Sequence, residues 1–357
     1  MMKTYTLKIK PVSPFSTPIQ ADTLFGHLCW AIRYLEGDEK KLLKFLEEFD
    51  SKPPIVMSNA FPRGYLPFPN LPPFSREEWE ELKRLFIKNE MGDGLDFSRW
   101  MKGLSKQRLI TVDTFNRCRV NFDRFDLYKK IIEKEICSFR FTFKSRDRDE
   151  KECKYKKENE FMTDAIWHNS ISRLTGTVGE GRLYDKEVRF YRPGTCLDVF
   201  IKTDYFSLPE LRELVLFISL NGFGGDKSIG NGRFDFEIEQ GSPLNDIEIF
   251  DCLMLISNTN PVILDRYDAY YTTQTKFGKL GGFFSTDSRY SPFKKPLVLL
   301  NPGTVVFTAE NVDYLGENFR DVYRRRDKSR SGIESPGPLD IRHYGIGYPV
   351  KMRLKND

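Results

Sequence analysis

NGFGGDKSIGNGRF, residues 221–234, is the stretch that says most about the fold. It contains five glycines and a Lys-Ser pair between two regularly patterned segments. Before it, apolar residues recur at helical spacing behind a capping box made of Ser207 and Glu210. After it, residues 234–238 alternate between apolar and acidic side chains, as in a half-buried strand. The sequence therefore predicts a helix that stops at the first glycines, a glycine-rich loop and a closing strand.

The segments nearer the N-terminus supply the remaining elements of the same unit. Residues 4–10 alternate between apolar and polar side chains, which predicts a strand. A loop rich in Pro and Ser follows, and then a predicted helix for which Asp22 is the expected N-cap. Residues 166–190 indicate a hairpin that leads into a strand at 197–202. The order of strand, helix, paired strands, helix and strand predicts a ferredoxin-like (RRM-like) unit.

We therefore expect an α+β chain of two ferredoxin-like (RRM-like) domains with long insertions. The N-terminal domain is predicted to span residues 1–245, with insertions at about 38–165 and the glycine-rich loop at 222–232. Later segments repeat the strand pattern after a turn-rich join, so a smaller C-terminal RRM-like domain is predicted at 246–357. Within the insertions, residues 144–160 are almost wholly charged, and the sequence assigns no role to them.

The composition is that of a chain with nearly balanced charge. Its 357 residues include 56 Lys plus Arg and 51 Asp plus Glu, so the net charge of +5 attracts nucleic acid only weakly and any basic surface must be local. The six cysteines include no CxxC pair, which argues against a zinc knuckle or a thioredoxin-type site. No uninterrupted apolar stretch is long enough to cross a bilayer. We expect a cytoplasmic protein with no membrane segment, metal or cofactor.

The chemistry of the glycine-rich loop points to phosphate. Glycines let a backbone approach an anion closely and direct N–H groups at it, while Lys227 and Ser228 add a charge and a hydroxyl. A Walker loop would need Gly immediately before the Lys, where this chain has Asp226, and it would follow a strand. Nucleotide hydrolysis is therefore not expected. A glycine-rich turn without any ligand is the alternative that composition alone leaves open.

At this loop the chain resembles the RAMP superfamily of CRISPR proteins, in which such a loop lies between the last helix and the last strand of an RRM-like domain. Four further segments, in the same order along the chain, resemble the type III-A (Csm) effector subunit that caps the guide RNA (crRNA) at its 5′ handle. They are FSTPIQADTLFGHLCWAIRYLEG (15–37), PPIVMSNAFPRGYLPFPNLPP (53–73), HNSISRLTGTVGEGRLY (168–184) and RHYGIGYPV (342–350). Each motif is only moderately specific, and the resemblance rests on their joint occurrence over nearly the whole chain.

This resemblance implies a non-catalytic RNA-binding subunit of a type III-A CRISPR interference complex in antiviral defence. The expected partners are the crRNA 5′ handle, the large polymerase-like subunit and the backbone RAMP subunit. The hairpin would correspond to the family's thumb and would contact phosphates and sugars together with the loop. For the hairpin residues, ordinary turn chemistry is the alternative. The residues implied in RNA binding are Asn169, Arg173, Thr175, Gly222, Gly224, Gly225, Lys227, Ser228, Gly230 and Arg233.

The histidines bear on whether the chain is an enzyme. His27 lies on the first predicted helix, on the face opposite Phe25, where it would face a cleft or solvent. Guide-processing endoribonucleases of the same superfamily resemble this layout, so a metal-independent endoribonuclease acting on CRISPR precursor RNA, with His27 as general base, is the rival interpretation. No second acid–base partner can be placed beside His27, which favours binding without catalysis. A structural adaptor without RNA contact is a third class, and His343 and Tyr344 are possible RNA-proximal residues.

Overall fold

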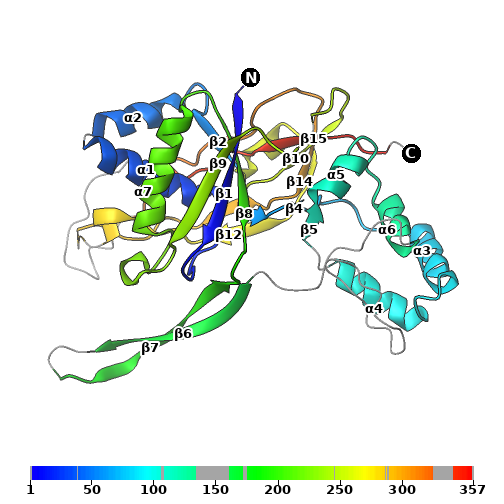
Figure 1. Ribbon diagram of the computed structural model, residues 1–357, viewed down its shortest axis with the longest axis horizontal. Helices are drawn as coiled ribbons and strands as arrows, with labels where there is room; N and C mark the ends of the chain where they lie inside the picture. The colour runs from blue at the N-terminus through cyan, green and yellow to red at the C-terminus, as the bar shows by residue number, and fades with distance from the viewer. Residues whose placement is uncertain are drawn as a thin grey trace.

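The structure is a computed structural model with an α+β fold built on several antiparallel sheets, as expected from the sequence (Figure 1). The predicted charged segment 144–160 and Arg173 lie outside the residues that it describes. The described residues are 2–37, 39–105, 108–133, 161–171, 175–244, 246–285, 287, 289–324 and 341–355. Within them, no helix combines the length and the hydropathy needed to cross a membrane.

The first sheet has the strand order β2-β8-β1-β9, and β3 also pairs with β8. Its central strand is β1, where Tyr5, Leu7 and Ile9 are buried while the intervening Thr and Lys side chains reach the other face. Tyr5 lies opposite Ile201 of β8 on one side and Gln240 of β9 on the other. The strands are β1 (Lys3–Pro11), β2 (Ile55–Met57), β3 (Phe61–Pro62), β8 (Leu197–Thr203) and β9 (Phe234–Gln240).

Helices α1 (Ala21–Glu36), α2 (Glu39–Glu48) and α7 (Leu208–Asn221) lie together on one side of this sheet (Figure 1). The predicted capping box of Ser207 and Glu210 starts α7, and the helix ends at the predicted glycine. The prediction that Asp22 caps α1 is wrong. The N-cap is Gln20, and the Asp22 carboxylate is instead buried beside His343 and Lys276, where its charge is compensated.

A helical insertion follows the first part of the sheet and lies at the other end of the molecule in Figure 1. Its own core contains Phe86, Phe97 and Trp100, which are fully buried against one another. The fully buried Arg119 donates from Nε to the Lys351 carbonyl at 2.8 Å and so joins the insertion to the C-terminal strand. The elements are β4 (Tyr65–Pro67), α3 (Arg76–Lys88), α4 (Gly94–Ser105), β5 (Leu109–Thr111), α5 (Val112–Cys118) and α6 (Arg124–Ile132).

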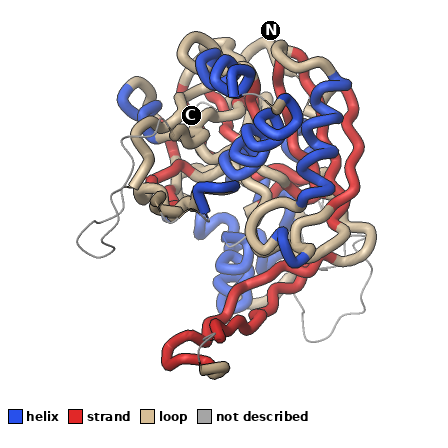
Figure 2. Tube along the Cα trace, turned by 90° about the vertical axis from the view of Figure 1, so that its left-hand side faces the viewer, coloured by secondary structure: helices blue, strands red, loops and turns tan. Residues whose placement is uncertain are grey.

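The predicted hairpin is present as β6 (Phe161–Ile171) and β7 (Val178–Tyr191). It extends away from the rest of the molecule in both views (Figures 1 and 2). Apolar side chains such as Met162, Trp167 and Leu183 are exposed along it. Its base is fixed to the body, because Arg189 exchanges two backbone hydrogen bonds with Phe15.

The strands beyond residue 246 form a second sheet with the order β11-β14-β10-β15 and a separate pair, β12-β13. One apolar cluster extends across residue 246, since Met254 and Tyr344 belong to the same cluster as Leu7, while a second cluster that includes Leu255 and Val306 lies wholly beyond it. A division into two domains near residue 246 stays a prediction. The elements are β10 (Cys252–Leu255), β11 (Ala269–Tyr270), β12 (Thr273–Lys276), β13 (Leu297–Leu300), β14 (Thr304–Phe307) and β15 (Pro349–Met352), with the helical turns η1 (Lys227–Ile229), η2 (Pro261–Asp265) and η3 (Gly282–Ser285).

Candidate functional site

The glycine-rich loop is closed on itself by backbone contacts. It begins at Gly222, which ends α7 with a φ of +83°. The Phe223 N–H donates to the Gly232 carbonyl at 2.9 Å. A Cβ atom at Gly232 would lie 2.0 Å from the Phe223 carbonyl oxygen, so only glycine fits where the two arms of the loop meet.

The Pro- and Ser-rich segment after β1 holds the loop from outside. Ser16 Oγ donates to the Gly225 carbonyl at 2.7 Å, and the Gly225 N–H donates to Thr17 Oγ1 at 3.2 Å. The Gly232 N–H donates to the Pro14 carbonyl at 2.7 Å. Contacts within the chain therefore hold the loop from this side.

His27 of α1 is the third support of the loop. Its Nε2 atom accepts a hydrogen bond from the Gly224 N–H at 2.8 Å, and its ring stacks on Phe223 with centroids 4.6 Å apart. Burial, with a smaller contribution from Lys227, lowers the pKa of His27 to about 4. The imidazole is therefore neutral near pH 7 with its proton on Nδ1, and Nε2 is not free to act as a general base.

These contacts use two of the N–H groups that were expected to bind an anion, while RNA binding at the loop stays a prediction. The N–H groups of Gly224 and Gly225 were expected to point at phosphate, but His27 and Thr17 accept them. The Gly230 N–H donates to the Lys227 carbonyl at 3.1 Å, and Gly222 is buried. The exposed side chains of the loop include those of Lys227, Ser228, Ile229 and Arg233. An anion at these positions would meet an ammonium, a hydroxyl and a guanidinium.

An ion pair joins the loop to the hairpin. Asp226 has a φ of +57° and places its carboxylate 2.5 Å from Lys186 Nζ of β7. On the same face of the hairpin, His168 and Tyr184 stack with centroids 5.4 Å apart and an interplanar angle of 13°. The loop and this face of the hairpin thus form a continuous surface. Sequence reasoning missed Lys186 and Tyr184, although the period-2 pattern of the hairpin places both on one face.

The predicted hairpin residues lie farther along the same element. Asn169 is exposed on β6, opposite Leu183. Thr175 is exposed in the turn, and its hydroxyl lies 2.9 Å from that of Thr177. Both side chains are accessible to a ligand, whereas Arg173 is outside the described residues.

One strip of α1 contacts both the loop and the segment that begins at the end of β12. Lys276 Nζ donates to Gln20 Oε1 at 2.9 Å and to Thr23 Oγ1 at 3.0 Å. Thr23 lies four residues before His27 and therefore on the same face of the helix, next to the contact with the loop. At the nearby Gly26 an added Cβ would meet no atom within 4 Å.

Beneath this strip lies a buried group of charges. Asp22 Oδ2 lies 3.1 Å from His343 Nε2 and pairs with Lys276, while Lys294 Nζ lies 3.3 Å from His343 Nδ1. Burial alone would raise the pKa of Asp22, but His343 and Lys276 together hold it well below its usual range. Burial lowers the pKa of Lys294 to about 8. The cluster ties the C-terminal segment to α1.

The two C-terminal candidates for RNA contact belong to the interior. His343 is 4% exposed and Tyr344 is 0% exposed. The Met57 N–H donates to Tyr344 Oη at 2.8 Å. Neither ring offers an open face to a base, so both residues act here through packing and hydrogen bonds. Among the described residues, no cluster of His, Cys, Asp or Glu is arranged to hold a metal ion.

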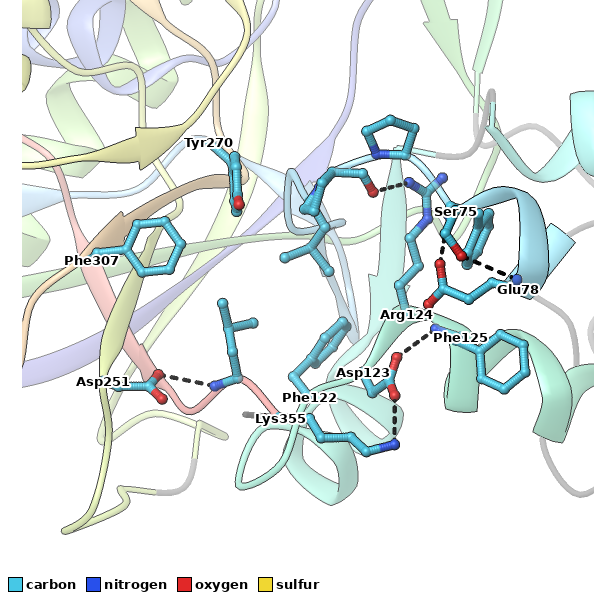
Figure 3. A pocket seen from close by; sticks show the side chains of 15 residues that line it. Ser75, Glu78, Phe122, Asp123, Arg124, Phe125, Asp251, Tyr270, Phe307 and Lys355 are labelled. Atoms are coloured by element: carbon cyan, nitrogen blue, oxygen red, sulfur yellow. Dashed lines mark hydrogen bonds and ion pairs between the residues drawn. The ribbon is translucent and has the colours of Figure 1, made fainter. Parts of the chain in front are cut away.

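A cavity of about 710 Å³ lies away from the loop, between the helical insertion and the second sheet (Figure 3). Tyr270 and Phe307 form one wall and Arg124 stands opposite them, donating to the Pro72 carbonyl at 3.2 Å. The Arg124 guanidinium lies over the Phe74 ring at 4.6 Å. No residue predicted from the sequence lines this cavity.

Comparison with known proteins adds two findings. The model of the RAMP superfamily matches residues 12–235. The chain is similar over 99% of its length to a chain of the crystal structure of the Csm3-Csm4 subcomplex in the type III-A CRISPR-Cas interference complex, with all 100% of that chain covered, 16% identity and a TM-score of 0.54. It is similar to a chain of the Csm1-Csm4 cassette in complex with pppApA over 99% of this chain and 98% of that one, with 16% identity and a TM-score of 0.52. No curated protein sequence matches.

Proposed function

The chain belongs to the RAMP superfamily, and we propose that it is the subunit of a type III-A CRISPR effector complex that binds the 5′ handle of the crRNA. In this role it connects the large polymerase-like subunit to the first backbone RAMP subunit. The function is binding and positioning, without catalysis by this chain. RNA bound at the loop would lie at the junction of the two neighbouring subunits.

The full-length likeness in fold supports this assignment over other RAMP roles. Csm4 is the component common to the Csm3-Csm4 and Csm1-Csm4 structures, and each match extends over 99% of this chain. Those complexes pair Csm4 with a different partner in each case, which is the property that a connecting subunit needs. The sequence identity of 16% means that the support comes from fold.

The observation that supports RNA contact most directly is the exposure of Lys227, Ser228 and Arg233 on a loop that other parts of the chain hold in place. Three contacts, from His27, Thr17 and Ser16, fix the loop. Side chains held in this way can bind phosphates without a large cost of ordering. Such contacts bind the RNA backbone and discriminate little between sequences.

The state of His27 supports a non-catalytic role. A general base needs a free lone pair and a pKa near the working pH, whereas Nε2 of His27 is occupied and its pKa is lowered to about 4. The Asp22 and His343 pair is buried and unavailable to RNA. We therefore expect labelled repeat RNA to stay intact when it is incubated with the protein. Cleavage that disappears in His27→Ala would instead establish the endoribonuclease.

Salt-dependent RNA binding tests the proposal. Lys227→Ala/Arg233→Ala should weaken binding of matched and scrambled handle RNAs by similar factors. It should also flatten the plot of log affinity against log salt by roughly 1.4, since each lost phosphate contact on single-stranded RNA contributes about 0.7. The matched control is Arg84→Ala/Lys88→Ala, which removes the same two charges from exposed positions on α3. The control should change neither quantity.

Two outcomes would contradict the proposal. If both double variants bind the handle like the parent chain, the loop has no role in RNA binding. If the loop variant loses only the discrimination between handle sequences while its salt slope stays unchanged, the loop reads bases and not phosphates.

A further inference from the structure

The segment after β12 has the composition of a nucleic-acid-binding surface. Residues 276–295 contain five basic residues and one acidic residue. Lys276 pairs with Asp22, Arg289 with Asp287 and Lys295 with Asp321, and Lys294 contacts His343 in the buried cluster, so the charge that the segment offers a ligand is chiefly that of Lys279. Five aromatic residues are interleaved with these charges. Aromatic rings and cations in alternation are typical of surfaces that bind single-stranded nucleic acid.

Several of these rings face solvent. Phe277 is 73% exposed, Phe283 is 50% exposed and Phe293 is 44% exposed. Lys279 Nζ lies 5.2 Å from the Phe293 ring centroid, so the lysine ammonium is next to one of the exposed rings. Phe277, Lys279 and Phe283 are called the aromatic shelf below. Lysine is depleted in the cores of protein–protein interfaces, so a shelf that mixes lysine with partly exposed rings fits RNA better than a protein partner.

The shelf is anchored along α1 at two points. Lys276, at its start, contacts Thr23 of the first turn. At its other end Gly282 lies against the Trp30 ring, where an added Cβ would come within 2.4 Å. Thr23 and Trp30 are seven residues apart, about 10 Å along a helix. The shelf therefore runs alongside the second turn of α1 (yellow segment, Figure 1).

The glycine-rich loop contacts the same face of α1, because His27 holds Gly224 and lies four residues after Thr23 and three before Trp30. Residues three or four apart on a helix have Cβ atoms about 5–6 Å apart, so the loop and the shelf contact adjacent positions of α1. An RNA strand with phosphates on the loop can place its bases on the shelf within a few nucleotides.

We propose that the aromatic shelf stacks bases of the RNA strand whose phosphates bind Lys227 and Arg233. This inference rests on the proposed handle binding and divides it between two surfaces, with the loop holding the backbone and the shelf holding bases. Every base can stack on an aromatic ring, so the shelf would position the RNA strand and increase its affinity independently of sequence. Lys279 adds a charge beside the stacked bases.

The test uses handle RNA with 5-iodouridine at single positions, bound to the full chain in its assembled complex. Photo-crosslinks should map to Phe277 or Phe283. Phe277→Ala should weaken handle binding by about 5- to 150-fold, the equivalent of 1–3 kcal/mol for one stacked base. Its salt slope should equal that of the parent chain, because no charge is removed. Phe277→Trp should restore binding, and Phe307→Ala, an exposed ring lining the separate cavity, is the control.

The loop and shelf variants together separate the two proposals. If Lys227→Ala/Arg233→Ala weakens binding while Phe277→Ala does not, the shelf is overturned and the handle-binding function stands. If neither variant weakens binding, the function itself fails. If Phe277→Ala binds RNA normally but no longer assembles with a neighbouring subunit, the shelf is a protein contact and the inference is overturned.

Discussion

His27 Nε2 accepts a hydrogen bond from the Gly224 N–H at 2.8 Å, which joins the second turn of α1 to the glycine-rich loop. The bond requires a neutral imidazole, because a protonated ring has no lone pair to accept with. Loop geometry is thereby linked to the protonation state of one residue. A histidine that would suggest catalysis in the sequence is thus a structural support in the fold.

We expect this bond to make stability depend on pH below neutrality. The pKa of His27 is about 4 when folded and near 6.5 when unfolded, so between these values the unfolded chain binds more protons. The stabilisation is complete above pH 6.5 and declines as the pH falls toward 4. Urea unfolding of the parent chain and His27→Asn should show a difference that shrinks over that range. His168→Asn, on the hairpin, is the control, and a difference independent of pH would contradict the prediction.

Replacing the buried carboxylate should destabilise the protein strongly. Asp22→Asn leaves Lys276 without its counter-ion and removes the carboxylate beside His343 in a buried site, and breaking a buried pair costs about 3–5 kcal/mol. The matched control is Asp113→Asn, because Asp113 pairs with Arg117 at an exposed position and such pairs contribute about 0–1 kcal/mol. Equal losses in chemical denaturation of the two variants would show that the cluster does not stabilise the fold.

Two glycines of the loop should respond differently to the same substitution. Gly230 and Gly232 both have positive φ, so alanine at either costs about 1–2 kcal/mol of backbone strain. At Gly232 the new Cβ would also clash with the Phe223 carbonyl oxygen, whereas at Gly230 it would meet nothing within 4 Å. Gly232→Ala should therefore lose a further 1–3 kcal/mol or so, the cost of overpacking. Equal melting temperatures for the two variants would show that the loop arms can move apart.

Sequence patterns predicted the elements whose signals are local. The capping box and the apolar spacing predicted helix α7 and the position at which it ends. Period-2 alternation predicted the strands β1 and β9 and the hairpin. The role of Asp22 was predicted wrongly because its partners, Lys276 and His343, lie in distant parts of the chain. A carboxylate near a helix start has the same local sequence whether it caps the helix or enters a buried ion cluster.

The candidate site shows the same limit. The composition of the glycine-rich loop predicted a close approach of its backbone to an anion, which stays a prediction, and the positive φ at Gly222 and Gly232 shows only that these positions favour glycine. Composition could not reveal that the Gly224 N–H is accepted by a histidine 197 residues away. It also missed the shelf, since Phe277 becomes notable only when its 73% exposure and the position of its segment beside α1 are known.

A single hydrogen bond between the two halves of the chain offers the final test. The Met57 N–H of β2 donates to Tyr344 Oη at 2.8 Å, and Tyr344 is completely buried. Tyr344→Phe keeps the ring and removes the acceptor, so the buried N–H loses its partner at a cost of about 1–3 kcal/mol. Because residues on both sides of position 246 share one apolar core, the loss should shift one cooperative unfolding transition to lower denaturant concentration.

Tyr271→Phe, at a 46% exposed position, is the control and should change the free energy of unfolding by less than about 0.5 kcal/mol. Two separate transitions, of which Tyr344→Phe shifts only one, would mean that the regions on either side of residue 246 unfold independently despite their common core.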